Sequence, residues 1–176
     1  TLRKAPKLSY QALHPGNNKQ NVPLALSIIL ETTIAAAKSY LPNREDIASF
    51  LTIFNTWWTI SNSKKRYTPN KLGNAIVKGD QKTDFYRKLA DYIETWSKPL
   101  VFTLITQIAR AFINTLRAHA ILIDELLNDN YEFILTAGLQ SDPIERRFSQ
   151  YRQMSGGRFL VSLREVMNSE QISVCR

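Results

Sequence analysis

Cysteine is almost absent from this chain of 176 residues, and histidine is nearly as scarce. The one cysteine, Cys175, has no second thiol with which to form an internal disulfide, and no cysteine–histidine cluster has the spacing of a zinc site. The two histidines, His14 and His119, lie far apart in the sequence, which indicates structural or surface roles. These scarcities exclude a disulfide-stabilised scaffold and a zinc module, and they favour an intracellular protein.

Glycine and the alternating pattern of a β-strand are scarce as well. The chain has six glycines and few runs in which apolar and polar residues alternate, so we predict a mainly α fold. Helices are predicted over 22–40, 44–60, 83–97, 99–128, 142–154 and 159–167. Residues 1–21 are predicted to be a loop and 61–80 a long basic loop with a short helix at 71–77. The one strand candidate is 131–136, where a short helix would also fit.

Helical periodicity also predicts which side chains face the core. In the helix at 99–128 the predicted inward residues are Val101, Leu104, Ile105, Ile108, Phe112 and Leu116. In the helix at 142–154 they are Ile144, Phe148 and Tyr151. The aromatic cluster of Phe50, Phe54, Trp57 and Trp58 has the spacing of a helix face. We interpret this cluster as core, although exposed aromatic rings could also stack on a base.

Acidic residues are outnumbered by basic ones. The chain has 23 lysines and arginines against 15 acids, a net charge of +8 and a pI of about 9.7. This balance favours an anionic partner such as nucleic acid, although a domain that is merely soluble and cationic has the same composition. The run Lys64-Lys65-Arg66 could contact phosphates or act as a nuclear signal, and it is equally typical of a solvated loop.

A long uncharged apolar run is missing. The most apolar stretch, 100–123, contains Gln107, Arg110, Asn114, Arg117 and His119. It is therefore predicted to be a buried helix, and no membrane partner is expected. The chain begins with Thr1 and shows no signal-peptide pattern, so we expect a fragment of a longer protein.

The segment Asp142-Pro143-Ile144-Glu145 has two interpretations. In the first, Asp142 is the N-cap of a helix, Pro143 is its first residue, and the Glu145 side chain reaches back to the N-cap amide. In the second, Glu145 helps to hold Mg²⁺ in a phosphoryl-transfer site, while nearby arginines contact DNA phosphates. One helical glutamate cannot build such a site alone, so the second interpretation requires further carboxylates.

The sequence from Tyr131 to Arg152, followed by Gly156-Gly157, resembles the C-terminal catalytic segment of P element-like DNA transposases. The resemblance combines the DxxE, the Phe-Ser pair, the following arginine and the glycine pair in order. In that family the segment ends an RNase H-like domain, and its glutamate completes a triad with two strand-borne aspartates. The resemblance implies that Glu145 is the catalytic acid and that Glu145 and Asp142 are ligands of Mg²⁺ or Mn²⁺.

Four arginines around this segment are candidates for contacts with the DNA backbone: Arg146, Arg147, Arg152 and Arg158. The glycine pair has a simpler interpretation, since glycine supplies the positive φ that commonly ends a helix.

The upstream part resembles, less specifically, the helical GTP-binding domain that this family inserts into its RNase H-like fold. On that resemblance Lys7, Val22, Asn55 and Trp58 are the candidate nucleotide contacts. Two positions depart from the family pattern: Asn21 replaces a lysine, and Thr59 replaces the carboxylate that would accept from guanine. Threonine lacks the paired acceptors of a carboxylate, so these departures argue against GTP binding.

The resemblance implies two domains, a GTP-binding-insertion-like domain over 1–128 and the C-terminal segment of the RNase H-like domain over 129–176. It leads us to expect a nuclear, DNA-binding transposase fragment that self-associates in a longer protein. The two partner aspartates would then lie upstream of Thr1, and this chain alone would not cleave DNA. The alternative is a domesticated helical module that binds nucleic acid or protein without chemistry.

Overall fold

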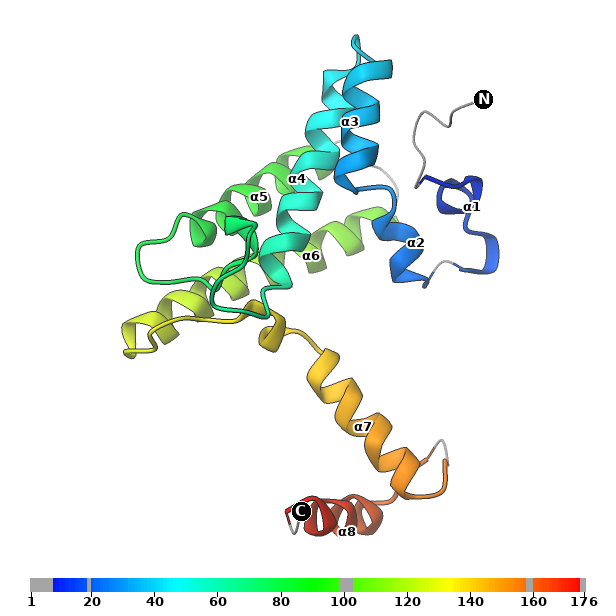
Figure 1. The fold of residues 1–176 in the computed structure, drawn as a ribbon, viewed down its shortest axis with the longest axis vertical. Coiled ribbons are helices and arrows are strands. Elements are labelled where there is room, and N and C mark those ends of the chain that lie inside the picture. The colour runs from blue at the N-terminus through cyan, green and yellow to red at the C-terminus, as the bar shows by residue number, and fades with distance from the viewer. Residues whose placement is uncertain (1–7, 19, 99–102, 158–159, 175–176) are drawn as a thin grey trace. The chain divides into compact units, whose positions relative to one another are not determined.

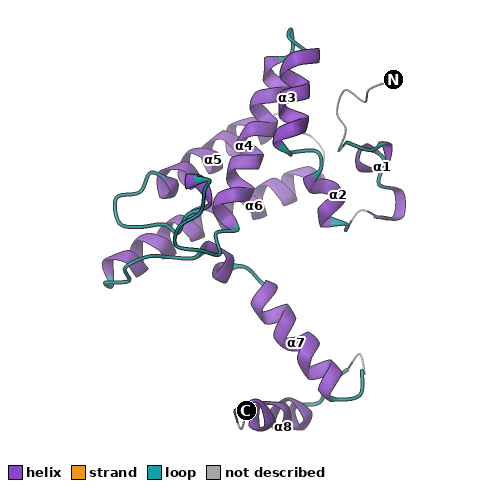
Figure 2. Ribbon diagram, viewed as in Figure 1, coloured by secondary structure: helices purple, strands orange, loops and turns teal. Residues whose placement is uncertain are grey.

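The computed structural model describes residues 8–18, 20–98, 103–157 and 160–174. Over these residues the regular elements are α-helices and short 3₁₀ helices, and no strand is present (Figures 1 and 2). The predicted mainly α class is therefore confirmed. The chain divides into two compact units, Thr1–Leu135 and Thr136–Arg176, called unit 1 and unit 2 below.

Unit 1 contains most of the helices. They are α1 (Tyr10–Leu13), η1 (Gly16–Asn18), α2 (Val22–Leu26), α3 (Glu31–Tyr40), α4 (Glu45–Ser61), η2 (Lys71–Gly73), α5 (Lys82–Ser97) and α6 (Thr103–Asn128). Unit 2 contains η3 (Thr136–Leu139), α7 (Asp142–Met154) and α8 (Leu163–Val174). The predicted helices at 44–60, 83–97 and 142–154 are confirmed to within a residue or two at each end.

The core of unit 1 lies between α5 and α6, which run side by side (Figure 1). Tyr86, Leu89 and Ala90 of α5 and Leu116, Ala120 and Ile123 of α6 are at most 2% exposed. Of the predicted inward residues of α6, Leu116 is buried and Phe112 half-buried, whereas Ile108 is 61% exposed. The true stripe includes Ala109 and Ala120, because small residues let the two helices approach closely. Periodicity judged on large side chains alone therefore placed the stripe about one residue away from its true position.

A second apolar contact joins α3 to α4, which pair closely (Figure 1). Ile34 and Ala37 of α3 pack with Ala48 and Leu51 of α4. The aromatic side chains of α4 extend this contact to α6, since the rings of Phe54 and Trp57 lie 6.2 and 5.0 Å from the ring of Phe112. Phe54 and Trp57 are half-buried, so the structure supports the interpretation of this aromatic cluster as core only in part.

The helix predicted over 22–40 is interrupted. Helix α2 ends at Leu26 and α3 begins at Glu31, and the hydroxyl of Thr33 donates to the carbonyl of Ser27 in the turn between them at 2.9 Å. By length and composition the segment Val22–Tyr40 could cross a membrane, with a mean hydropathy of 1.4. In the structure the turn divides it, and α3 packs against α4.

Two segments outside the long helices differ from the predictions. Within 1–21, predicted as loop, Ser9 caps the short helix α1 by accepting from the amide of Ala12 at 3.1 Å. The strand candidate at 131–136 makes a single antiparallel bridge between Ile134 and Ile76 and continues into η3. One bridge satisfies two pairs of backbone groups, so the segment needs no sheet.

Helix α8 begins later than predicted, at Leu163 instead of residue 159. A capping box sets its start: the Glu165 carboxylate accepts from the amide of Ser162 at 2.8 Å, and the Ser162 hydroxyl accepts from the amide of Glu165 at 3.3 Å. The Ser-x-x-Glu pattern is visible in the sequence and would have given the correct start.

Candidate functional site

The glutamate of the DxxE motif lies in the first turn of α7. The N-cap is Ser141 in a helical conformation, and its side chain does not cap the helix, so the predicted N-cap at Asp142 is wrong by one residue. Instead, the Ser141 hydroxyl donates to Oε1 of Glu145 at 2.7 Å, and the Glu145 amide donates to the Ser141 carbonyl at 2.9 Å. The side chains of Asp142 and Pro143 lie outside the described part of the structure.

The Glu145 carboxylate is exposed, and one of its oxygens has no hydrogen-bond partner among the described residues. That oxygen can serve as one ligand of a hard cation. Within the described ranges no three Asp, Glu, His or Cys side chains lie close enough together to hold a metal ion. These residues alone therefore do not fit a complete Mg²⁺ site, and the catalytic and metal roles of Glu145 and Asp142 stay predictions.

The four predicted DNA-contacting arginines have different surroundings. Arg146 is exposed and forms no ion pair with a described residue, and Arg152 is half-buried. Arg158 lies outside the described residues. Arg147 is already engaged, because its Nε donates to Oε1 of Glu170 on α8 at 2.9 Å.

Arg147, Tyr151 and Glu170 form the polar cluster that joins α7 to α8. The Arg147 guanidinium binds both carboxylate oxygens of Glu170, and the Tyr151 hydroxyl also donates to Glu170. The carboxylate, followed by the tyrosine hydroxyl, raises the pKa of Arg147 above its ordinary value. In turn Arg147, followed by Tyr151, holds the pKa of Glu170 below its ordinary value. This arrangement gives Arg147 a structural role that the sequence did not reveal, while its contact with DNA stays a prediction.

The glycine pair after α7 behaves as predicted. Gly156 and Gly157 have φ values of +77° and +76°, and the amide of Gly157 donates to the carbonyl of Arg152 at 2.7 Å. This six-residue closure is typical of a helix C-terminus that requires the left-handed conformation.

Two of the predicted nucleotide contacts share a groove in unit 1. Val22 and Trp58 line a groove of about 320 Å³ between α2 and α4. Asn55 does not line it, because its side-chain amide donates to the carbonyl of Ile29 at 2.7 Å and so fastens the turn before α3. Lys7 lies outside the described residues.

The chemistry of this groove is apolar and aromatic, and none of its described lining residues carries a charge. Asn21 caps α2 by accepting from the amide of Leu24 at 3.0 Å, and the Thr59 hydroxyl donates to the carbonyl of Asn55 at 2.9 Å. The described lining therefore offers rings that could sandwich a base but no cation for phosphates. These described residues alone do not fit GTP.

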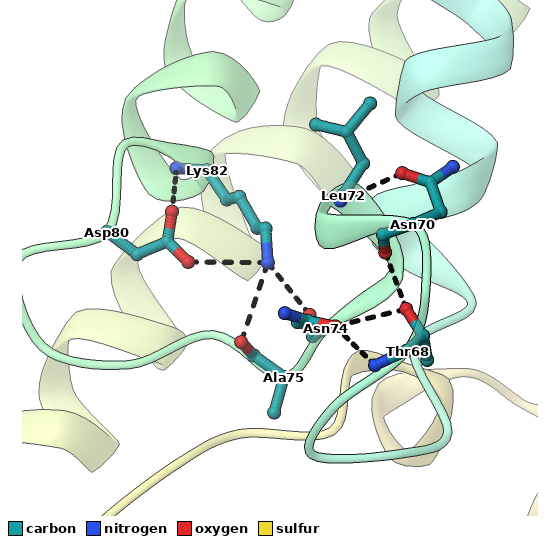
Figure 3. A network of polar contacts seen from close by, with 7 residues as sticks. All are labelled: Thr68, Asn70, Leu72, Asn74, Ala75, Asp80 and Lys82. Atoms are coloured by element: carbon teal, nitrogen blue, oxygen red, sulfur yellow. Dashed lines mark hydrogen bonds and ion pairs between the residues drawn. The ribbon is translucent and has the colours of Figure 1, made fainter.

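A larger pocket lies elsewhere in unit 1, in the loop that follows α4. It has a volume of about 710 Å³ and is lined by residues of α4, the loop at 62–81 and α5. Figure 3 shows the polar network that shapes this loop, in which the Lys82 ammonium donates to the Asn74 carbonyl at 2.8 Å and pairs with Asp80 at 3.3 Å. Lys82 is buried, so its charge is neutralised within the fold.

Side-chain amides hold the rest of the loop. The Asn74 amide oxygen accepts from the amide of Thr68 at 2.6 Å, and the Asn70 amide oxygen accepts from the amide of Leu72 at 3.0 Å (Figure 3). The sequence predicts this segment only as a basic loop with a short helix at 71–77, and it does not reveal the pocket. One signal could have revealed an ordered loop: the segment is rich in residues whose side chains form hydrogen bonds with the backbone in turns. These residues are Thr68, Asn70, Asn74 and Asp80.

Comparison with known proteins identifies a structural relative. No protein-family model matches the chain, and neither does any curated protein sequence. Among solved structures, the chain is similar to a chain of the Drosophila P element transposase strand transfer complex, with a TM-score of 0.72 and 19% identity. The match covers 99% of this chain and 42% of that transposase chain, so this chain spans less than half the length of its relative. The likeness establishes a transposase-like fold.

Proposed function

We propose that this chain is part of a P element-like cut-and-paste transposase, in which it binds DNA and contributes one acid to the metal site. The observation that carries the proposal is the fold that 99% of the chain shares with the transposase of a P element strand transfer complex. The net charge of +8 supports an anionic partner. A nuclear location and self-association within a longer transposase belong to the same proposal.

In this proposal Glu145 is the metal-side acid. Its carboxylate lies on the surface of α7, and the Ser141 hydroxyl fixes one oxygen at 2.7 Å while the other faces solvent. When bound, Mg²⁺ or Mn²⁺ would neutralise the charge of the phosphate and activate the attacking oxygen. The remaining ligands must come from outside the described residues, and Asp142 and two further aspartates are the candidates.

The apolar surface of unit 2 also supports a place within a larger assembly. Six large apolar side chains in the described part of unit 2 are exposed: Ile144, Phe148, Met154, Leu160, Leu163 and Met167. So much apolar surface on so small a unit is typical of an interface with further protein.

A second candidate function is a domesticated module that binds DNA without catalysis. Asn21 and Thr59, the two positions that depart from the family pattern, are both engaged in hydrogen bonds within unit 1. This supports a helical domain kept for its fold and surface.

Fluorescence anisotropy with labelled DNA at increasing salt, with and without Mn²⁺, tests both candidates. Wild-type affinity is expected to fall with salt, with a slope of about −0.9 for each phosphate contacted. In a longer protein that also carries the two partner aspartates, Mn²⁺ is expected to tighten binding for the wild type and for Glu125→Gln, which removes an exposed acid of α6, but not for Glu145→Gln.

The outcomes separate the candidates. Salt-dependent binding that Mn²⁺ tightens only when Glu145 is present supports the transposase proposal. Salt-dependent binding on which Mn²⁺ acts equally in all three proteins supports the domesticated module. Binding that is indifferent to salt contradicts both.

A further inference from the structure

The pocket of about 710 Å³ after α4 has no role in the proposal above. We infer that it binds one unpaired nucleotide of a DNA strand, with the base on Tyr67 and the flanking phosphates on Lys71 and Lys88. The inference rests on the proposed DNA-binding function and deepens it by naming the part of the substrate that this pocket receives.

The charges around the pocket favour an anion. Asp80 is paired with Lys82, Asp84 with Arg87, and Arg66 with Glu132. Two charged residues of the pocket lining form no ion pair with a described residue, and these are Lys71 and Lys88. Both side chains are exposed, so a phosphate can reach them without displacing an internal partner.

The walls of the pocket favour an aromatic ring. Tyr67 is 73% exposed, and the Arg66 guanidinium lies 5.4 Å from the centre of its ring. Ile60, Leu72 and Phe85 line the same pocket. An exposed tyrosine beside an arginine is a common platform for a nucleobase, because every base has a π-face that can stack.

The shape of the pocket is already set without a ligand. The hydrogen bonds of Asn70, Asn74 and Lys82 order the loop (Figure 3), and paired bonds of 3.0 and 2.8 Å between the backbones of Ile76 and Ile134 fasten its end. Its volume falls in the range of about 300–1,000 Å³ that is typical of small-molecule pockets. A preformed pocket avoids the cost of ordering a loop on binding.

Only an unpaired base can enter such a pocket, since a base within a duplex is stacked and paired on both sides. Binding should therefore favour DNA with a single-stranded overhang over blunt duplex. Free mononucleotide has the same base and phosphate chemistry but lacks the flanking phosphates that would occupy both lysines.

The test compares three ligands with the full chain: blunt duplex, the same duplex with a short overhang, and free dAMP as a competitor. The double variant Lys71→Gln/Lys88→Gln is matched by Lys38→Gln/Lys98→Gln, which removes two exposed lysines from other parts of unit 1. Tyr67→Ala tests the stacking platform. All five substitutions in these three variants fall on exposed side chains, and circular dichroism checks that the helices are retained.

The pocket variant is expected to weaken binding of the overhang by about tenfold and to reduce the salt slope by about 2, one unit for each phosphate contact, whereas the matched control changes little. Tyr67→Ala is expected to weaken overhang binding by at least about fivefold while leaving blunt duplex unchanged.

Several results would overturn the inference while leaving the proposed function intact. If the wild type binds DNA but the two double variants behave alike, the pocket does not contact phosphates. If Tyr67→Ala weakens duplex and overhang equally, no base enters the pocket. If dAMP competes at a lower concentration than the overhang itself, the occupant is a free nucleotide. Loss of all DNA binding by the wild type would instead contradict the proposed function.

Discussion

Different interactions stabilise the interior of unit 1 and the interior of unit 2. Nineteen apolar side chains are buried among the described residues of unit 1. Among the described residues of unit 2, the one buried apolar side chain is that of Tyr151. Unit 2 relies instead on polar contacts, the Arg147–Tyr151–Glu170 cluster and the capping box at Ser162. Burial of apolar surface dominates folding free energy, while exposed ion pairs contribute little. Unit 1 should therefore carry its own stability, and unit 2 should depend on further protein.

The first prediction tests this contrast with the substitution that has the largest expected effect on the free energy of unfolding. Leu116→Ala should lower the free energy of unfolding of unit 1 by about 2–5 kcal/mol, because the fully buried side chain leaves a cavity between α5 and α6. Phe148→Ala, at a position that is 53% exposed in unit 2, should change it by less than about 0.5 kcal/mol. Urea denaturation followed by tryptophan fluorescence reports on unit 1 alone, since Trp57, Trp58 and Trp96 all lie there.

A loss for Phe148→Ala as large as that for Leu116→Ala would contradict the contrast, because it would mean that the exposed face of α7 stabilises unit 1. Leu116→Met is the matched variant that keeps most of the side-chain volume, and it should recover most of the lost stability.

The helices of both units could be predicted from the sequence because their apolar periodicity and end signals are local. Helix α7, at Asp142–Met154, has the predicted bounds, and α4 and α5 differ by only a residue. Tertiary contacts decided the rest. The turn between α2 and α3 depends on Asn55, which lies 26 residues from its partner Ile29, and no local pattern reveals such a pair.

The two units differ in how their sites could be predicted. In unit 2 the DxxE motif and the glycine pair are each short local patterns, so Glu145 and the end of the helix just before Gly156 were visible in the sequence. The buried stripe predicted from Ile144, Phe148 and Tyr151 is wrong for the first two, which are 61% and 53% exposed. Periodicity identifies the apolar face of a helix, but it does not show whether this chain contains the surface against which that face packs. In unit 1 the pocket at Tyr67 depends on side-chain amides that fold an irregular loop, which periodicity cannot detect.

The second prediction separates a structural from a ligand-binding role in unit 1. Asn55→Ala should lower the free energy of unfolding by about 1 kcal/mol, because it removes the donor to the partly buried carbonyl of Ile29. The control is Thr52→Ala, at an exposed residue whose hydroxyl donates to the Ala48 carbonyl of its own helix at 2.7 Å, and its loss should have almost no effect. Equal stability of Asn55→Ala and the wild type in urea denaturation would show that this hydrogen bond does not hold the turn.

The third prediction concerns the polar contacts of unit 2 and has the smallest effect on global stability. The pKa of Glu170 is held below its ordinary value of 4.5 by Arg147 and then Tyr151, so the folded state favours the ionised carboxylate. The contribution of this cluster to stability is therefore present above pH 4.5 and is lost as the pH falls through the lowered pKa.

In ¹H–¹⁵N NMR spectra recorded from about pH 6 to about pH 3, amide shifts of α7 and α8 near the cluster should change together with the Glu170 carboxyl signal. Glu170→Gln should abolish this joint transition, and Arg147→Lys should move it toward the ordinary value because lysine cannot bind both oxygens in parallel. A Glu170 carboxyl that titrates at or above 4.5 in the wild type would show that the cluster does not join the two helices, and the polar half of the contrast between the units would fail.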